Sequence, residues 1–520
     1  MRLAKSVIHG IATGLLLLTL SCIVLLPPIS SIGAPSGEVT SVSGTQTFHM
    51  KGGDPATGDG GFSLVASTVF DSLVSPTVEQ NYAPSLAKSW KISPDWKYID
   101  FSLRDDVKFQ NGDPFTAEDV KFSLETYMRR ELRFWLQRLY SKNIKQIEIK
   151  NPYQVRLHLT EPWPWILTNF WYHTGMLPKK YRETVGDAGF ADKPVGTGPF
   201  NWMEYKQDVY FKLGAVQHHF RKTPEIKTLT VRFVPEASTR LAMLKAGEAD
   251  IVELAPPLIP PVKSDPNLKL FFIKHTQGLG LWFCDLVFPN EPSPFLDIRV
   301  REAASLAVDR ATICEKILFG GAEPMKDYLA PITLGYNPNA PADSYHPEKA
   351  KALMAAAGYA KGFETTIHAL PPGQAWVEAV ASNLMEVGIR PKIEIYELGA
   401  LLEKFKAKNL RGLGFPGIVY WNPDRHPGKD GSNFWTRGQT WCYNSTPEIE
   451  AAVQKSIQAA SDEEIAKYGR MMADQIRASR LMLPLWSTHV VFGLTRKIKE
   501  WQPVQGVPMG TRYEYLKVGN

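Results

Sequence analysis

Alternating and helically spaced apolar residues divide this chain into strands and helices that are mixed throughout its length. Apolar and polar residues alternate over Thr228–Phe233 and Gln154–Leu159, which predicts half-buried strands. Apolar residues recur at helical spacing in four later segments, namely Arg299–Leu318, Pro347–Ala357, Thr446–Ala459 and Asp462–Ser479. Strands and helices that interleave in this way predict an α/β or an α+β fold.

Local signals sharpen two of these elements. Thr116 and Asp119 have the spacing of a capping box, which predicts that a helix begins at Ala117 and runs to Arg130. Proline clusters flank the strand-like segment Lys269–Phe283. Because proline and glycine clusters interrupt regular structure, this segment is a candidate crossing between two lobes.

The N-terminus has the pattern of an export signal. Arg2 and Lys5 precede the apolar run Ile11–Leu26, and two prolines and a stretch of small residues follow it. A basic start, an apolar run and small residues are typical of a secretory signal peptide, so we expect residues 1–33 to be removed. A retained membrane anchor and a lipid attached to Cys22 are the alternatives.

Composition and charge exclude several classes of function. The 520 residues include 59 Lys and Arg against 53 Asp and Glu, a net charge of +6 that is too weak for nucleic-acid binding. Phosphate-binding loops, HExxH and GxSxG are absent, and we expect the adjacent His218 and His219 to lie on a solvated surface. We therefore expect a ligand-binding protein rather than an enzyme, with no cofactor and no metal. An exported hydrolase acting on peptides or glycans is the alternative, because 53 acidic residues provide many carboxylate pairs.

A family resemblance rests on several strings that occur in one order. Leu103–Val120 resembles the signature of the family 5 extracellular solute-binding proteins, the peptide- and nickel-class receptors of bacterial ABC importers. Further similar strings are Ala83–Trp90, Val195–Phe200, Arg240–Ile251, Phe295–Ala303, Asp309-Arg310 and His346–Leu353. The turn and glycine residues in these strings suit a scaffold role rather than ligand contact.

The resemblance implies a two-lobe periplasmic-binding-protein-like fold with an inserted subdomain in the first lobe. By similarity the first lobe takes residues 34–54, 194–276 and 489–520, the inserted subdomain 55–193, and the second lobe 277–488. The implied function is that of the exported substrate-binding subunit of an ABC importer. It would capture a small solute (oligopeptide-like, sugar or other) in the cleft between the lobes and deliver it to the permease subunits. We expect a monomer in the periplasm or at the extracytoplasmic face of the cell envelope.

Aromatic density nominates the binding residues. The 29 residues 415–443 contain seven aromatic side chains among Gly, Pro, Asn and Asp, which suits a stacking surface better than a core. The candidate ligand-binding residues are Tyr420, Trp421, Asp424, Trp435, Trp441 and, on the crossing strand, Trp282. A second cluster, Trp163–Tyr172, lies in the expected inserted subdomain, and its setting favours a packing role.

One departure from the family pattern bears on the ligand. The family usually has an acidic residue in this part of the second lobe, and in its peptide-binding members that residue pairs with the α-amino group of the peptide. Val419 stands at the matching position here, and Asn422 replaces a second acid. Burying an α-ammonium without a partner is costly, so we expect short peptides to bind poorly. Asp424 or Asp285 could substitute for the missing acid, an uncharged or sugar-like ligand fits equally well, and His426 leaves a nickel chelate as a minor alternative.

Overall fold

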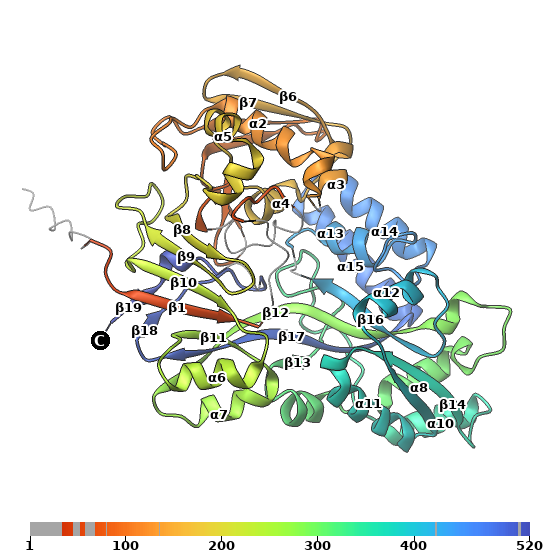
Figure 1. Ribbon diagram of the computed structural model, residues 1–520. Coiled ribbons are helices and arrows are strands. Elements are labelled where there is room, and N and C mark those ends of the chain that lie inside the picture. The colour runs from red at the N-terminus through yellow and green to blue at the C-terminus, as the bar shows by residue number, and fades with distance from the viewer. Residues whose placement is uncertain are drawn as a thin grey trace, which may run out of the picture. The chain divides into compact units, whose positions relative to one another are not determined.

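The computed structural model describes residues 34–44, 52–57, 68–79, 81–134, 136–421, 424–507 and 511–519 (Figure 1). The expected signal segment, with Cys22, lies outside these residues. Within the described ranges, none of the helices is both long enough and apolar enough to cross a membrane.

Eleven strands of the described chain form one mixed sheet. In chain order they are β1 (Glu38–Ser43), β8 (Phe200–Lys206), β9 (Tyr210–Ala215), β10 (Thr228–Phe233), β11 (Ile251–Leu254), β12 (Leu268–Phe283), β13 (Ala322–Pro324), β14 (Phe363–Ala369), β15 (Ile389–Ile395), β16 (Leu413–Trp421) and β17 (Met482–Thr495). Across the sheet the order is β15, β14, β16, β12, β17, β11, β1, β10, β9, β8, and β13 also pairs with β17. The sheet therefore has an N-terminal group of strands (β1 and β8–β11) and a C-terminal group (β14–β16).

Two long antiparallel strands join these groups. β12 and β17 lie side by side from Leu268 opposite Thr495 to Trp282 opposite Met482 (Figure 1). β17 also pairs with β11 and β12 with β16, so β17 borders the N-terminal group and β12 borders the C-terminal group. The predicted crossing strand is confirmed as β12. Its ladder with β17 is interrupted between Ile273 and Gln277, and such an irregularity bends a strand locally.

Helices cover both groups of strands. Beside the C-terminal group lie α8 (Ile298–Ala307), α10 (Pro347–Ala356), α11 (Gln374–Glu386), α12 (Leu398–Lys406), α13 (Pro427–Phe434), α14 (Pro447–Gln458) and α15 (Asp462–Ser479). Val300, Val377 and Leu384 from these helices are buried against Ile367 and Ile389 of the strands. Two helices, α6 (Ala237–Lys245) and α7 (Ile259–Lys263), lie beside β11 in the N-terminal group (Figure 1). Burial of the apolar helix faces against the sheet is the main source of stability here.

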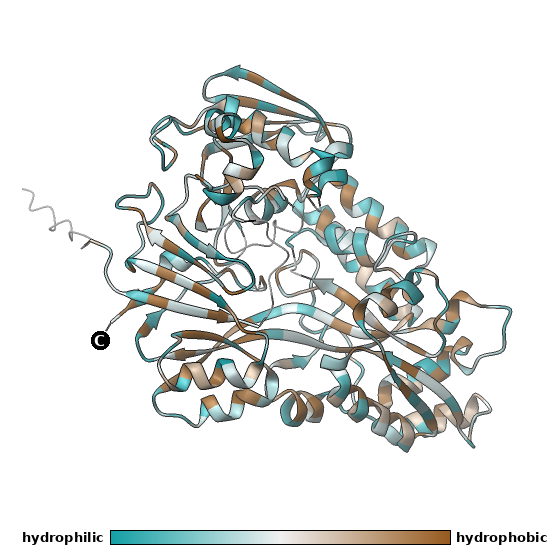
Figure 2. Cartoon of the chain, in the orientation of Figure 1, coloured by the Kyte–Doolittle hydropathy of each residue, from teal (hydrophilic) through white to brown (hydrophobic). Residues whose placement is uncertain are grey.

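Residues 55–193 hold two further small sheets. β4 (Ala87–Ile92), β5 (Tyr98–Leu103), β7 (Gln154–Leu159) and β6 (Ile144–Asn151) form one in that spatial order, and β2 (Val74–Pro76) pairs with β3 (Tyr82–Pro84). The α-helices in the described part of this segment are α2 (Ala117–Tyr127), α3 (Gln137–Asn143), α4 (Ile166–His173) and α5 (Lys179–Asp192). Teal and brown bands alternate along β6 and β7, the pattern of strands with one buried face (Figure 2). Short elements elsewhere in the described chain include α9 (Arg310–Thr312), β18 (Ile498–Glu500) and β19 (Lys517–Val518).

Several sequence predictions are confirmed at residue level. The capping box of Thr116 and Asp119 is present at the start of α2. The strings that resemble the family signature also act as scaffold. The Gln110 side chain donates to the carbonyls of Gly198 and Phe200 and accepts from the Gly196 N–H. A Cβ on Gly196 would lie 2.0 Å from the Val69 carbonyl oxygen, so only glycine fits this close approach.

The continuous helix expected over residues 299–318 is wrong. α8 ends at Ala307 because Val308 is extended, and a new turn begins at Arg310, followed by a π-helical segment, Ile313–Ile317. Asp309 stabilises the break, since its side chain accepts from the N–H and the hydroxyl of Thr312. A carboxylate used as a cap competes with helix continuation, and the hydrophobic pattern does not record this.

The histidine pair and the cysteines lie in different surroundings. His218 is exposed as expected, but His219 is buried, with Nε2 3.0 Å from a carboxylate oxygen of Asp71. The Arg221 guanidinium pairs with the same carboxylate and with Glu514, so the buried charges are paired. Cys284, Cys314 and Cys442 form no disulfide and are buried.

Candidate functional site

The two tryptophan clusters of the sequence meet around one cavity of about 580 Å³. Its aromatic lining consists of Trp163, Trp165, Trp171, Trp421 and Trp441, together with Phe434. The first three belong to the 55–193 segment, at and around α4. The others belong to the 277–488 segment, at the end of β16 and around α13. A volume of this size is typical of a small-molecule site.

The wall from the 55–193 segment is built on α4. Trp163, which precedes the helix, is 2% exposed and packs edge-on against Tyr140, with ring centroids 5.5 Å apart. Trp165 is the residue before α4, and Trp171 lies in its last turn. Trp163 and Asn169 each hold a buried N–H group, Nε1 and Nδ2, that finds no hydrogen-bond partner among the described residues. Buried donors of this kind are rare and mark a place where an acceptor is missing.

The opposite wall begins where β16 ends. Trp421, the last residue of that strand, is 36% exposed and is therefore the large aromatic of this wall most open to contact. Lys429 of α13 is half-buried, and its Nζ donates to the Trp421 carbonyl at 3.1 Å. Behind them Asp430 is buried, and burial raises the pKa of its carboxyl to about 7. This acid faces the Trp421 N–H at 3.5 Å and does not line the cavity.

Asp424 joins the two walls instead of facing the cavity. Its carboxylate accepts from the His426 N–H at 2.7 Å and from the hydroxyl of Thr168 on α4. The Tyr82 hydroxyl lies 2.7 Å from the same Thr168 oxygen, and the rings of Trp165 and His426 are 5.8 Å apart. The sequence predicts that Asp424 contacts the ligand. In the structure this residue is 3% exposed, and its carboxylate is already hydrogen-bonded across the two segments.

Three other candidates of the sequence lie in the core. Trp282 and Trp435 are 0% exposed and pack on each other with centroids 5.3 Å apart. Tyr420 is 2% exposed, and its hydroxyl donates to Ser487 at 2.8 Å. Alternation along β16 explains the outcome, because neighbouring residues of a strand point to opposite faces, so Tyr420 and Trp421 cannot face the same side. Of the six candidates, only Trp421 and Trp441 line the cavity.

One ring nitrogen of His426 is already occupied. Nδ1 accepts from the Gly428 N–H at 3.0 Å, and the imidazole is buried. In the part of the chain that the structure describes, no group of three or more His, Cys, Asp or Glu side chains is arranged to hold a metal ion.

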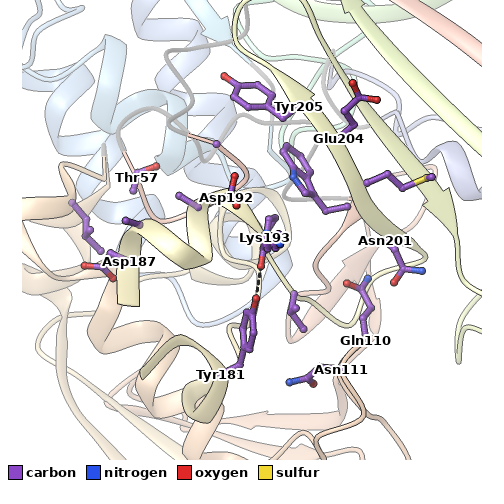
Figure 3. A pocket seen from close by; sticks show the side chains of 18 of the residues that line it. Thr57, Gln110, Asn111, Tyr181, Asp187, Asp192, Lys193, Asn201, Glu204 and Tyr205 are labelled. Carbon is purple, nitrogen blue, oxygen red and sulfur yellow. Dashed lines mark hydrogen bonds between the residues drawn. The ribbon is translucent and has the colours of Figure 1, made fainter. Parts of the chain in front are cut away.

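A larger cavity of about 1570 Å³ lies between α5 and β8 (Figure 3). Its lining is polar and apolar in nearly equal measure, and the hydroxyl of Tyr181 in its wall donates to the Lys193 carbonyl at 2.9 Å. Asp187 in its wall is paired with Arg129 and Arg182. None of the six candidate residues lines this cavity, so its size alone does not make it the site.

Comparison with known proteins identifies the family. The model of the bacterial extracellular solute-binding proteins, family 5 (middle part), matches residues 81–441, which is more than half of the chain. The chain belongs to the family 5 extracellular solute-binding proteins. Members of this family are solute-binding proteins rather than enzymes and serve as the substrate-binding subunits of ABC importers, so the function expected from the sequence is confirmed.

Individual family 5 relatives differ in what they are named for. The heme-binding protein A of Haemophilus influenzae is 28% identical over 421 residues, 74% of this chain and 75% of that protein. The dipeptide-binding protein of Escherichia coli is 28% identical over 352 residues, 62% of this chain and 65% of that protein. The peptide-bound DppA of Helicobacter pylori has a TM-score of 0.74 and 24% identity, and the match covers 94% of this chain and 99% of that chain. This likeness confirms the two-lobe fold.

Sequence reasoning does not bring the two tryptophan clusters together. A packing role is expected for the Trp163–Tyr172 cluster, and Trp165 and Trp171 line the same cavity as Trp421. Thr168, Asn169 and Lys429 carry no local signal, since a single polar residue on a helix is ordinary. The clustering of tryptophan in two parts of the sequence was the available signal. It indicated the residues of both walls but could not show that the two clusters lie around one cavity.

Proposed function

We propose that this family 5 protein binds its transported solute in the tryptophan-lined cavity, stacked on Trp421 and Trp441 and closed in by Trp165 and Trp171. The observation that carries the proposal is the meeting of two aromatic clusters, from distant parts of the sequence, around one cavity of suitable volume. Aromatic faces cover flat or ring-shaped apolar surfaces well, and the indole N–H and neighbouring amides provide hydrogen bonds.

A ligand between the two walls would hold them together. It contacts α4 on one side and α13 on the other, so it stabilises the arrangement in which both walls are close. The Thr168 to Asp424 hydrogen bond beside the cavity belongs to that same arrangement. Capture therefore needs no covalent chemistry, and we propose that the chain is not an enzyme.

The proposed ligand is not a short peptide with a free amino group. Val419, which replaces the usual acid, is 0% exposed, and Asp424 is engaged with Thr168 and His426. An α-ammonium in the cavity would lose its hydration without gaining a carboxylate in return. The relatives named for dipeptides and heme show that ligands vary within the family, so the cavity itself has to define the class.

The finer expectations on location and assembly are part of this proposal. We propose an exported monomer in the periplasm that docks on a membrane permease and does not bind nucleic acid. The lobe boundaries expected from the family resemblance are kept as the proposed division, with residues 55–193 as the inserted subdomain.

Native mass spectrometry of the purified mature protein tests the proposal. A retained small molecule that is lost in Trp421→Ala, but kept in a matched Trp96→Ala control on a remote turn, would support it. Protein without any bound solute, which also shows no thermal shift with oligosaccharides, aromatic acids, peptides or metal chelates, would contradict it.

A further inference from the structure

We infer that His489 is a positioning residue for the two lobes: while its ring is uncharged it holds the joint between the two groups of strands, and its protonation releases that joint. The inference goes beyond the proposed function, because it does not depend on which cavity holds the solute. It begins with the ladder between β12 and β17. The register is interrupted between Ile273 and Gln277, so that residues 274–276 of β12 stand opposite a single residue of β17, His489.

This break lies between the two groups of strands. β11 of the N-terminal group pairs with Val491–Leu494 of β17, on one side of the break. β16 of the C-terminal group pairs with β12 between Gln277 and Phe283, on the other side. The proposed lobe boundaries, 276/277 and 488/489, fall at the same place. Because a bulge bends a strand locally, a change in the angle between the lobes is taken up most easily here.

His489 supports the irregular backbone of the break. His275 has a φ of 56°, a left-handed conformation that residues other than glycine rarely adopt. The His275 N–H donates to Nδ1 of His489 at 3.2 Å, and the His489 N–H donates to the Gly321 carbonyl at 2.8 Å. The side chain of His489 is 4% exposed. One buried ring nitrogen therefore accepts the hydrogen bond that holds a strained residue in place.

The neighbours of each ring decide where its proton lies. Nδ1 of His489 accepts from a backbone N–H, which cannot accept in return, so the proton of the neutral ring is on Nε2. Nδ1 of His275 lies 3.1 Å from the oxygen of the Ser487 hydroxyl, which can either donate or accept. A second proton can therefore be accommodated on His275, whereas on His489 it removes the acceptor. The charge of the His489 ring is thus coupled to the joint.

The groups around the two rings set the direction of the response to acid. Burial lowers the pKa of both rings, Lys274 lowers it further, and Lys326 does so for His275, whose ring lies 5.5 Å from that of His489. The Glu323 carboxylate of β13 opposes this, since it lies 3.5 Å from Nε2 of His275 and 3.8 Å from Nε2 of His489. Protonation therefore costs more in this arrangement than in one that exposes His489 to water, and acid shifts the equilibrium away from it.

Pulsed electron–electron double resonance between the lobes tests the inference on the full mature chain. Glu248→Cys in the first lobe and Lys361→Cys in the second place spin labels at exposed positions, and the three described native cysteines are buried. Distances are recorded at about pH 7.5 and about pH 5, on either side of the ordinary histidine pKa of about 6.5. We expect acid to move at least about half of the population to a second distance, with an unchanged far-UV circular dichroism spectrum.

Matched substitutions identify the ring that responds. His489→Asn keeps a neutral acceptor near the position of Nδ1, so it should keep the distance of the neutral protein at both pH values. His275→Asn keeps the backbone N–H and tolerates a left-handed conformation, so it should respond to acid as the wild type does. His489→Leu removes the acceptor and should show the second distance at both pH values.

Three results would overturn the inference. The first is a wild-type distance that does not change with pH, and the second is acid unfolding of the whole chain in place of a second distance. The third is a response to acid in His489→Asn that equals that of the wild type, because the titrating group would then lie outside the joint.

Discussion

Trp421 and Trp435 belong to one sequence cluster, but their substitution by alanine should change different properties. Trp421→Ala should weaken solute binding, and Trp435→Ala should lower the free energy of unfolding. Trp421 is 36% exposed in the cavity wall, and Trp435 is 0% exposed against Trp282. A tryptophan buries up to about 250 Å², so roughly 90 Å² of Trp421 remain for a ligand to cover. At about 25 cal/mol per Å² this contact contributes about 2 kcal/mol, or roughly 30-fold in Kd.

Trp435→Ala removes a buried ring instead. Its cost falls on the free energy of unfolding, at about 3–5 kcal/mol for a large aromatic in a core, and the Val419 carbonyl also loses the donor that Trp435 Nε1 provides at 3.2 Å. Calorimetric titration with the retained solute measures the first effect, and urea unfolding measures the second. If Trp421→Ala lowers stability by several kcal/mol, or leaves the Kd unchanged, the reasoning from exposure is refuted.

Three further predictions concern the surroundings of the cavity. Thr168→Val should speed solute release about fivefold to 30-fold, since it removes a hydrogen bond to the Asp424 carboxylate, and the exposed Thr160→Val is the control in stopped-flow measurements. The pKa of the Asp430 carboxyl is about 7 in the folded protein, above its ordinary value of 3.8. As pH rises, the unfolded chain therefore loses this proton first. The free energy of unfolding falls as pH rises from about 4 to about 7, by up to roughly 4 kcal/mol. Asp430→Asn should flatten this slope in urea melts across pH, and an unchanged slope would count against the burial argument. The three described cysteines are buried, so a thiol reagent should modify them only after denaturation; rapid modification of the native protein would argue otherwise.

Elements that depend on neighbouring residues, and the family to which the chain belongs, could be predicted from the sequence. The capping box at Thr116, the crossing strand β12 and the long helix α15 depend on neighbouring residues, and the structure has them where the pattern predicts. The break after Ala307 could not be predicted, because it depends on whether Asp309 caps a new turn or continues the helix.

The site was predictable only in part. Aromatic density indicated one wall of the proposed site, because Trp421 and Trp441 line the cavity. The sequence could not show which tryptophans face inward, since exposure is set by partners far along the chain. Asp424 shows this most clearly. The sequence predicts that it contacts the ligand, but its carboxylate accepts a hydrogen bond from Thr168, which lies 256 positions away in the chain.

A crystal structure of the mature protein with the solute that it retains from its host tests the central claim most directly. We predict electron density for a single small molecule between Trp165 and Trp421, with its ring on the Trp421 indole. Density in the larger cavity between α5 and β8, with the tryptophan-lined cavity empty, would contradict the account.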